Sequence, residues 1–347
     1  MKVMTPMIHK AKALLFSGLV LTATIVSPVQ AEEIACTGKN LLSELKEKSP
    51  DLYATLENTA VSLPYGEGLL WKVEKKGVKP SYLFGTMHMA DPRLIDLPAH
   101  VQKAFDESST LALEITDILD PKALQQKAQG LMQYSLYLDG TTVEDRMTAE
   151  QVKVVGENFA NRAPVPWLLA KRMRPWALIG ALALPACENA RKAAGKPFLD
   201  QLLAQKADAA GKELVSLETL ESQMKVMASL PEEMMVDALV QTAKMGIRLD
   251  DVFETMISLY TQENTGLIWA MMKKLGPTGL EPAPQSVGYA EFQRELVDER
   301  NENMVSAALP LLDKGGAFIA IGALHLPGES GMLKILEQKG YRISAVR

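Results

Sequence analysis

Two histidines of this chain follow the same short pattern, which is the strongest chemical signal in the sequence. His88 ends residues 82–88 (YLFGTMH) and His325 ends residues 319–325 (IAIGALH), so each follows an apolar run, a glycine and two further residues. A glycine at a strand end lets the backbone turn sharply or approach another chain closely. Two such turns on neighbouring strands would bring two imidazoles together, and neutral imidazoles are favoured ligands of Zn, Mn, Fe and Co. The pattern therefore predicts a metal site, against the alternative of two unrelated histidines with local hydrogen bonds.

Two carboxylates also follow apolar runs. Glu114 ends residues 111–114 (LALE) and Glu218 ends residues 214–218 (LVSLE). Ligands of open α/β sheets gather outside the carboxyl ends of the strands, so these side chains are expected to converge with the histidines. Two histidines with one or two carboxylates can hold a divalent metal and leave a position for water. For each glutamate alone, a salt bridge or a helix cap is the simpler interpretation.

Arg300 lies on the apolar face of a predicted helix over residues 286–312. A partly buried guanidinium needs an acidic partner or an anionic ligand, and Glu114, Glu218 or a substrate carboxylate can supply it. The alternative is an arginine whose head group reaches solvent at the helix margin. The residues that share the predicted face are Phe292, Leu296, Arg300, Met304, Ala307 and Leu311.

Short β-rich runs surround a long helical region. Strands are predicted over residues 69–73, 82–84, 110–113, 214–217, 317–321 and 341–346. Apolar spacings of three and four predict helices over 121–138, 148–160, 166–192, 199–209, 232–247, 250–274 and 286–312. Residues 177–187 are too few to cross a membrane and predict a buried core helix. The expected fold class is α/β (α+β), a small mixed sheet of N- and C-terminal strands with a helical insertion at about 120–310.

The first 31 residues have the layout of a cleavable export signal. A lysine-bearing start precedes an apolar stretch over residues 13–26, and small residues surround a cut after Ala31. The expected product, residues 32–347, is a single domain in the periplasm or secreted, with no membrane anchor. The segment holds three lysines and no acid, so its removal takes the net charge from −5 to −8. The two cysteines, Cys36 and Cys187, are either a disulfide or two buried thiols.

These features together resemble the TraB/GumN family, which includes TIKI-like metalloproteases and is remotely related to the erythromycin-esterase and ChaN-like group. The matching stretches, in the family's order, are residues 70–74, 82–89, 111–115, 199–200, 217–219 with Gln223, 299–301 with Met304, and 321–331 with 340–341. The resemblance implies an α/β fold with a helical insertion. For the TIKI-like branch it implies a divalent-metal-dependent peptidase with His88 and His325 at the metal, supported by Glu114, Glu218 and Arg300. Those relatives are membrane-tethered, whereas this chain ends without a strongly apolar tail.

Three functions follow from these observations. The first is an exported metal-dependent hydrolase, plausibly a peptidase, in which His88, His325 and Glu114 bind Mn, Co or Zn and Glu114, Glu218 and Arg300 serve catalysis. The second is a periplasmic haem- or metal-binding protein without turnover, and the third is a metal-free esterase-like hydrolase. The expected partner is a peptide or a small-molecule substrate, and the helical insertion can serve as a lid or as the surface of a homodimer.

Several classes are excluded by missing motifs and by charge. The sequence has no phosphate-binding loop of the Walker type, no G-x-S-x-G elbow and no H-E-x-x-H pair. An acidic chain without a basic stripe does not favour nucleic acid as a partner. The remaining histidine of residues 32–347, His100, is expected to be a solvated residue or a helix-end residue.

Overall fold

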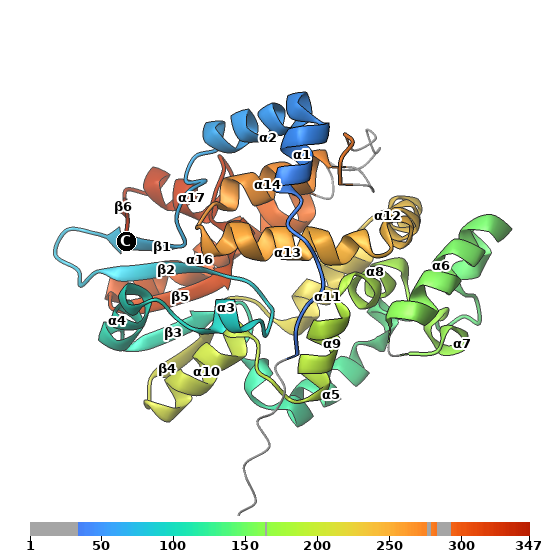
Figure 1. Cartoon of the computed structure of the whole chain (residues 1–347). Coiled ribbons are helices and arrows are strands. Elements are labelled where there is room, and N and C mark those ends of the chain that lie inside the picture. Colours follow the sequence, from blue (N-terminus) through green and yellow to red (C-terminus); the bar gives the residue numbers. More distant parts are fainter. Residues whose placement is uncertain (1–33, 164, 276–278, 283–292) are drawn as a thin grey trace, which may run out of the picture. The chain divides into compact units, whose positions relative to one another are not determined.

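The computed structural model describes residues 34–163, 165–275, 279–282 and 293–347 of the chain, and residues 34–347 form one compact unit (Figure 1). The predicted export signal, residues 1–31, lies outside the described residues. No described helix is long and apolar enough to cross a membrane.

A six-stranded mixed sheet lies at one side of this unit. The strand order is β4-β3-β5-β2-β1-β6, in which β2, β5, β3 and β4 run parallel and β1 pairs antiparallel with both β2 and β6. The strands are β1 (Leu70–Glu74), β2 (Ser81–Thr86), β3 (Thr110–Leu113), β4 (Glu213–Ser216), β5 (Ala317–Gly322) and β6 (Arg342–Ala345). The sheet confirms the expected α/β class, and helical segments join β3 to β4 and β4 to β5.

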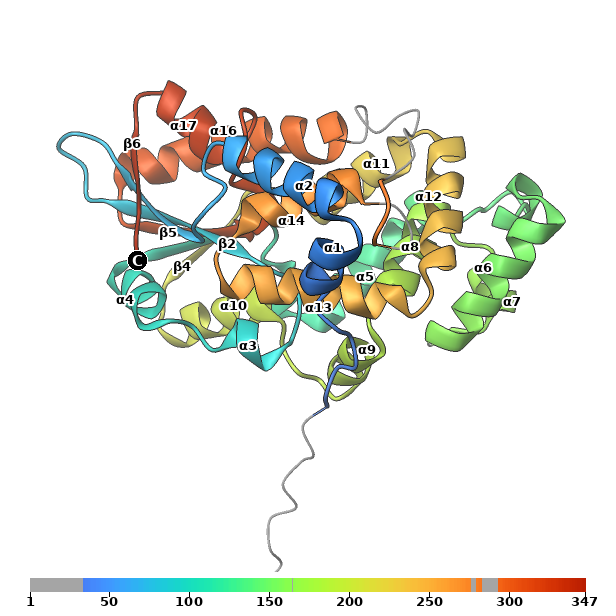
Figure 2. The ribbon, with the colours of Figure 1, turned by 45° about the horizontal axis from the view of Figure 1, so that its top comes forward.

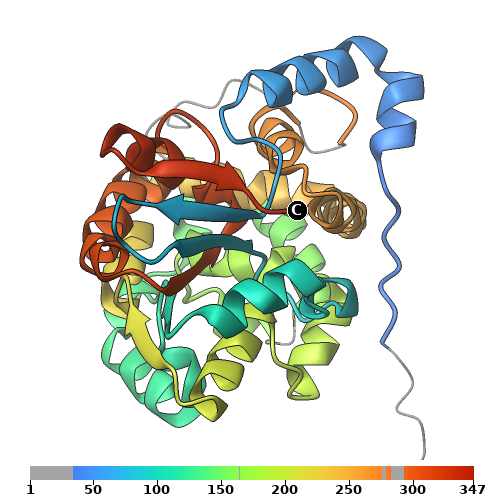
Figure 3. The same cartoon turned by 90° about the vertical axis from the view of Figure 1, so that its left-hand side faces the viewer.

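Alternating side chains of the sheet enter two different hydrophobic cores. On β5, Phe318 and Ala320 pack into one core, whereas Ile319 and Ile321 pack into the other, as the two-residue period of a strand requires. Figure 3 shows α16 and α17 against one face and helices such as α4 and α10 against the other. Because both faces are covered, the central strands are apolar throughout rather than alternating with polar residues.

The described helices differ in length and in the signals that bound them. The N-terminal helices α1 (Leu42–Lys48) and α2 (Pro50–Ser62) were not predicted, and neither were α3, α4, α11 and α17, whose bounds follow. The others are α3 (Pro92–Ile95), α4 (Ala99–Glu107), α5 (Pro121–Gly130), α6 (Ala149–Arg162), α7 (Trp167–Ala170), α8 (Pro175–Ala183), α9 (Ala186–Ala193), α10 (Leu199–Ala209), α11 (Leu220–Ser229), α12 (Glu232–Met245), α13 (Arg248–Thr261), α14 (Thr265–Lys274), α16 (Glu299–Lys314) and α17 (Met332–Gln338).

Three predicted helices were too long. The helix predicted over 121–138 ends at Gly130, and the one over 250–274 is divided because Asn264 accepts a hydrogen bond from the Leu267 amide and starts α14. The stretch 166–192 is divided into α7, α8 and α9. Pro175 is the first residue of α8 and Pro185 immediately precedes α9, so one helix cannot continue through them. The core helix predicted over 177–187 accordingly ends at Ala183. In contrast, α10 spans residues 199–209 as predicted.

The last long helix has a different buried face from the predicted one. A π-helical turn over Arg294–Asp298 precedes α16. The buried face of α16 comprises Asn301, Met304, Val305, Ala308 and Leu312. Ala307, which the sequence placed on the apolar face, is exposed, and the predicted helix start over 286–292, including Phe292, lies outside the described residues.

A second group of helices packs away from the sheet. Phe159 of α6, Leu178 and Leu182 of α8 and Leu239 of α12 form a separate hydrophobic core. Figures 1 and 2 both place α6 and α7 at the far end of the unit from β1 and β2.

Candidate metal centre

Four candidate site residues predicted from the sequence follow the four parallel strands. His88, Glu114, Glu218 and His325 come one to three residues after the ends of β2, β3, β4 and β5. The carboxyl ends of parallel strands lie at one edge of the sheet, so all four side chains start from that edge. This edge is the candidate site.

The glycines of the two repeated motifs sit where the backbones approach each other. Gly85 pairs with Ile321 across β2 and β5, and a Cβ atom on Gly85 would lie 2.9 Å from the Cα atom of Ala323. A Cβ atom on Gly322 would lie 3.3 Å from Oε1 of Glu114 and 3.8 Å from Nε2 of His88. A side chain at Gly85 would therefore clash with the chain after β5, whereas a methyl group at Gly322 would enter the space between the candidate site residues.

His88 is oriented from behind by a carboxylate. Its Nδ1 atom lies 2.7 Å from Oδ2 of Asp200, and Oδ1 of Asp200 accepts a hydrogen bond of 2.7 Å from the hydroxyl of Thr86. A carboxylate is an acceptor, so Nδ1 carries the proton and Nε2 is left to face Glu114, whose Oε1 lies 3.7 Å away. Desolvation lowers the His88 pKa, but the charges of Asp200 and Glu114 outweigh it and raise that pKa well above 6.5. The side chain is 53% exposed.

His325 is oriented by an amide instead. Its Nδ1 atom lies 2.7 Å from Oδ1 of Asn301, and Nδ2 of Asn301 donates to the Ser330 carbonyl, which fixes the orientation of the amide. The imidazole thus donates from Nδ1, and Nε2 is its second ring nitrogen. His325 is buried, and desolvation lowers its pKa to about 4. The two histidines therefore have opposite pKa shifts.

Glu114 lies between the two motifs. Its Oε1 atom accepts a hydrogen bond of 2.9 Å from the Gly322 amide, and its Oε2 atom accepts from Arg300 at 2.8 Å and Gln223 at 3.1 Å. Burial alone would raise the Glu114 pKa, but His88, His325 and Arg300 together hold it well below 4.5. Glu114 is consequently an anion at neutral pH.

Arg300 joins the two glutamates. Its Nη2 atom contacts both Glu114 and Glu218, and its Nε atom lies 3.0 Å from Oε1 of Glu218. Burial lowers the Arg300 pKa, yet Glu218 and Glu114 raise it above its usual value. Gln223 donates to both carboxylates. Glu114 and Glu218 were two of the partners that the sequence suggested for Arg300, and both bind its guanidinium.

Two helices fix the backbones of the histidine loops. The hydroxyl of Tyr260 on α13 donates to the Gly85 carbonyl at 2.7 Å, and the indole of Trp269 on α14 donates to the Leu324 carbonyl at 3.0 Å. Tyr260 stays neutral and able to donate because burial raises its pKa well above 10. Each repeated motif is thus held by one hydrogen bond from a helix, buried at Gly85 and partly buried at Leu324.

Part of the donor set has the separation and the outer partners that suit a divalent transition metal, while the donor atoms of His88, Glu114 and His325 do not all lie within 4.8 Å of one another. Two imidazoles whose Nδ1 atoms are held by Asp200 and Asn301 match the usual arrangement in which an outer partner orients a ligating histidine. The 3.7 Å between His88 Nε2 and Glu114 Oε1 is close to the about 3.4 Å that separates two ligands of one tetrahedral ion. Imidazole and carboxylate donors suit Mn, Co and Zn.

A tighter group of donor atoms lies elsewhere in the part of the chain that the structure describes. Donor atoms of Cys36, Asp91 and Glu188 all lie within 4.8 Å of one another. Cys36 is bonded to Cys187 in a disulfide, so the two cysteines are not buried thiols, and Cys36 has no thiolate to offer. Arg191 already pairs with both Asp91 and Glu188, and Arg93 pairs with Asp91 as well. This group is an ion-pair cluster rather than a metal site.

Sequence reasoning did not assign roles to two residues that orient the histidines. Asp200 lies in the first turn of α10, where an acidic residue ordinarily complements the helix dipole. Asn301 follows Arg300 in α16 and is buried on the same helix face as Met304. His100 lies in α4, with Nε2 3.9 Å from Glu263, and takes no part in the site.

Comparison with known proteins gives a family and several relatives. The model of the TraB/PrgY/gumN family matches residues 69–345, which confirms the resemblance seen in the sequence. Metalloprotease TIKI1 and metalloprotease TIKI2 of Danio rerio are 28% and 27% identical to this chain over 79% of its length, and the matches cover 62% and 60% of those proteins. A metalloprotease TIKI homolog of Nematostella vectensis is 24% identical over 80% of this chain and 67% of its own length. The chain thus spans less than two thirds of the two Danio rerio relatives. No solved structure matches.

Proposed function

The chain belongs to the TraB/PrgY/gumN family, and from this premise we propose that it is an exported metal-dependent hydrolase that cleaves peptides. The observation that carries the proposal is the meeting of His88, Glu114 and His325 around Gly322, with each imidazole oriented from behind. The relatives named metalloproteases support a metal and a peptide bond as the target.

His88, His325 and Glu114 would hold the metal, which is Mn, Co or Zn. A divalent ion bound there would polarise a substrate carbonyl and make a water molecule more acidic. Glu114 remains ionised because His88, His325 and Arg300 lower its pKa, so it can bind the ion or accept a proton from water. His325 stays neutral above about pH 5, since its pKa is lowered to about 4, and its lone pair is available for binding.

Arg300 and Glu218 support Glu114. Arg300 holds one oxygen of Glu114, and Glu218 fixes Arg300 through Nε and Nη2. The guanidinium therefore keeps Glu114 aimed at the histidines, and it would also orient a substrate. Glu218 contributes by holding Arg300 and shares Gln223 with Glu114.

Export to the periplasm or the exterior agrees with the disulfide. Cys36 and Cys187 are bonded, and disulfides persist in oxidising compartments and are rare in the cytosol. The export signal expected over residues 1–31 would deliver the chain there.

The test is metal content and peptidase activity of the purified protein and its histidine variants. After chelation and reloading with Mn, Co or Zn, the wild type should bind about one ion and cleave peptides in a mixed library read by mass spectrometry. His88→Ala and His325→Ala should lose both, whereas the control His100→Ala should keep both because His100 lies outside the site.

Other results would identify the alternatives. A wild type that binds no divalent metal after reloading contradicts the proposal. Hydrolysis that survives exhaustive chelation would indicate a metal-free esterase-like enzyme. A Soret band on addition of haem, without hydrolysis, would indicate a carrier.

A further inference from the structure

The loop that carries His88 is held from behind by a buried ion-pair cluster. Glu188 accepts a hydrogen bond of 2.8 Å from the Ala90 amide, two residues after His88. Arg191 contacts Glu188 and donates to Oδ2 of Asp91 at 3.1 Å. The side chains of Asp91, Glu188 and Arg191 are 3–7% exposed, so these contacts are shielded from water. Movement of Glu188 or Arg191 would be transmitted to the loop within three residues of His88.

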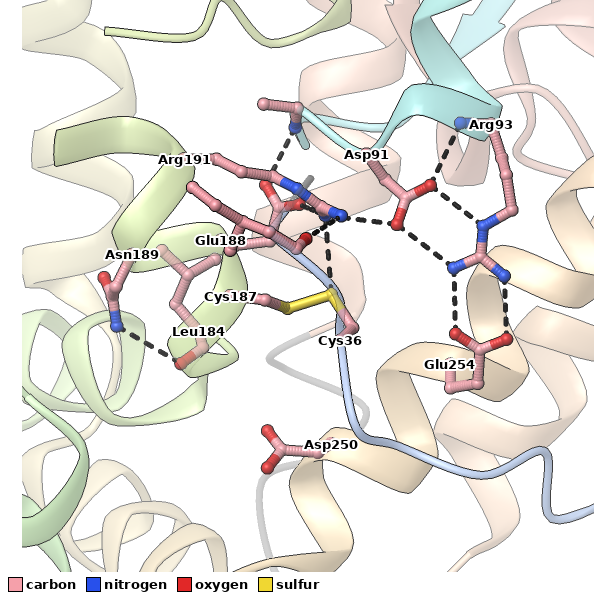
Figure 4. Close-up of a disulfide and its surroundings, with 12 residues drawn as sticks. Cys36, Asp91, Arg93, Leu184, Cys187, Glu188, Asn189, Arg191, Asp250 and Glu254 are labelled. Carbon is pink, nitrogen blue, oxygen red and sulfur yellow. Dashed lines mark hydrogen bonds and ion pairs between the residues drawn. A yellow bond between two sulfur atoms is a disulfide. The ribbon is translucent and has the colours of Figure 1, made fainter. Parts of the chain in front are cut away.

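A disulfide joins this cluster to the N-terminal segment. Cys187, the residue before Glu188, is bonded to Cys36 across 151 positions of sequence. Arg191 donates to the Ile34 carbonyl at 2.8 Å and contacts Sγ of Cys36 at 3.4 Å. Figure 4 shows Arg191 between the disulfide, Glu188 and Asp91. The disulfide therefore keeps in place the Ile34 carbonyl and Glu188, which both accept hydrogen bonds from the buried Arg191 side chain.

Loss of the disulfide would release only a short segment. The Lys39 amide is bound to Asp251 and the Leu41 amide to Thr255, so the chain remains attached to α13 from residue 39 onward. Residues 34–38 would be freed, and Arg191 would lose the Ile34 carbonyl with them. The loop would keep one anchor, because Arg93 still joins Asp91 to Glu254.

We propose that Glu188 and Arg191 are positioning residues for His88, and that the Cys36–Cys187 disulfide makes metal binding at His88 sensitive to thiol reductants. The proposal rests on the proposed function, because it assigns a regulator to the same metal centre. Asp200 fixes the ring of His88 directly, whereas Glu188 and Arg191 fix the backbone on which that ring stands.

The redox step is a thiol–disulfide exchange with a dithiol. One thiolate of the dithiol attacks a sulfur of the Cys36–Cys187 bond, which breaks and releases one cysteine. The second thiol of the dithiol then displaces the other cysteine, so the dithiol becomes a disulfide and the protein gains two thiols. Two electrons and two protons pass from the dithiol to the protein.

The experiment compares oxidised wild type with Cys36→Ser/Cys187→Ser, which lacks the bond and also lacks thiols that could bind metal. Co²⁺ is the probe, and its visible absorption reports both affinity and ligand geometry. The variant should bind Co²⁺ roughly tenfold more weakly, in the range typical of changes to groups that orient metal ligands. In the metal-free proteins, amide hydrogen exchange over residues 87–91 should be faster in the variant.

Substitutions at Glu188 separate positioning from general stability. Glu188→Ala removes the acceptor of the Ala90 amide, whereas Glu188→Gln keeps an oxygen there, so the glutamine variant should recover part of the Co²⁺ affinity. Glu144→Ala is the matched control, because Glu144 pairs with Lys171 in the distant helical group. It should change neither Co²⁺ affinity nor exchange at residues 87–91.

Each outcome decides a separate claim. Equal Co²⁺ affinity in the oxidised wild type and the double serine variant would overturn the proposal, and so would unchanged exchange at residues 87–91. Faster exchange without weaker binding would also overturn it, since His88 would then not depend on the cluster. If the oxidised wild type binds no Co²⁺, the proposed function fails, and the exchange rates still decide whether the cluster positions the loop.

Discussion

Oδ2 of Asp200 lies 2.7 Å from Nδ1 of His88, whereas the equivalent nitrogen of His325 faces the uncharged amide of Asn301. The two histidines come from the same sequence pattern, yet the group behind each one differs in charge. Together with the burial of His325, this difference moves the two pKa values in opposite directions. The site therefore holds one histidine that protonates readily and one that stays neutral.

Asp200→Asn should lower the His88 pKa in the metal-free protein. The substitution removes a negative charge that favours the imidazolium, while the desolvation that opposes it remains. NMR titration of the histidine ring protons measures the change, and His325, with a pKa of about 4, is the internal reference. The same variant should bind Co²⁺ roughly 10- to 100-fold more weakly, because the ring loses its orienting partner. A His88 pKa equal to that of the wild type would contradict this account.

Metal binding should strengthen as pH rises through the neutral range. A proton on Nε2 of His88 competes with the ion, and the His88 pKa is raised well above 6.5. Below that pKa the apparent Co²⁺ affinity should fall about tenfold for each pH unit, since one proton is displaced. Glu114 and His325 add no slope above about pH 5, because their pKa values are lowered. An apparent Co²⁺ affinity that stays constant between about pH 5.5 and about pH 7.5 would show that His88 is not a ligand.

Gly322→Ala should weaken metal binding with little loss of stability. The added methyl group would lie 3.3 Å from Oε1 of Glu114 and 3.8 Å from Nε2 of His88, in the space between the proposed ligands. The backbone at Gly322, with φ −51° and ψ 130°, is open to alanine, so folding is not strained. We expect an affinity loss on the order of tenfold, measured by Co²⁺ titration.

The control is Gly180→Ala in α8, where a Cβ atom would meet nothing within 4 Å. That variant should bind Co²⁺ as the wild type does and should be about 0.5–1 kcal/mol more stable, because alanine favours a helix over glycine. Equal losses of metal affinity in both variants would rule out the local explanation at Gly322.

Cys36→Ser/Cys187→Ser should lower the free energy of unfolding by about 3–5 kcal/mol. The bond closes a loop across 151 positions, and a long closed loop restricts the unfolded chain strongly. Urea denaturation of the variant and of oxidised wild type gives the difference. Identical midpoints and slopes would mean that the disulfide contributes nothing to global stability.

The sequence was sufficient to predict the strands of the sheet and the edge at which the candidate site residues lie. Apolar runs bounded by turn residues are a local property, so all six strands were located to within one or two residues, and the α/β class is confirmed. Because the residue after a parallel strand starts from a known edge, His88, Glu114, Glu218 and His325 could be assigned to one place before the structure. Their role as metal ligands and catalytic groups stays a prediction.

The ends of the helices and their buried faces were harder to predict from the sequence. Prolines divide residues 166–192 into separate helices, whereas the apolar spacing alone predicted one continuous helix there. The π-helical turn before α16, whose hydrogen bonds reach five residues, leaves no periodic signal. For Arg300 the sequence indicated an acidic partner or an anionic ligand, against a side chain that reaches solvent, and the structure shows Glu114 and Glu218 as its acidic partners.

The sequence by itself determined which candidate residues follow the parallel strands and at which edge of the sheet they lie, since both follow from local patterns of side chains. Only the tertiary structure decided what stands behind each histidine. Asp200 reaches His88 from 112 residues away and Asn301 reaches His325 from 24, and Cys36 joins Cys187 across 151 positions. Contacts of this kind depend on how helices pack on the sheet, and a pattern read along one chain contains no measure of that packing.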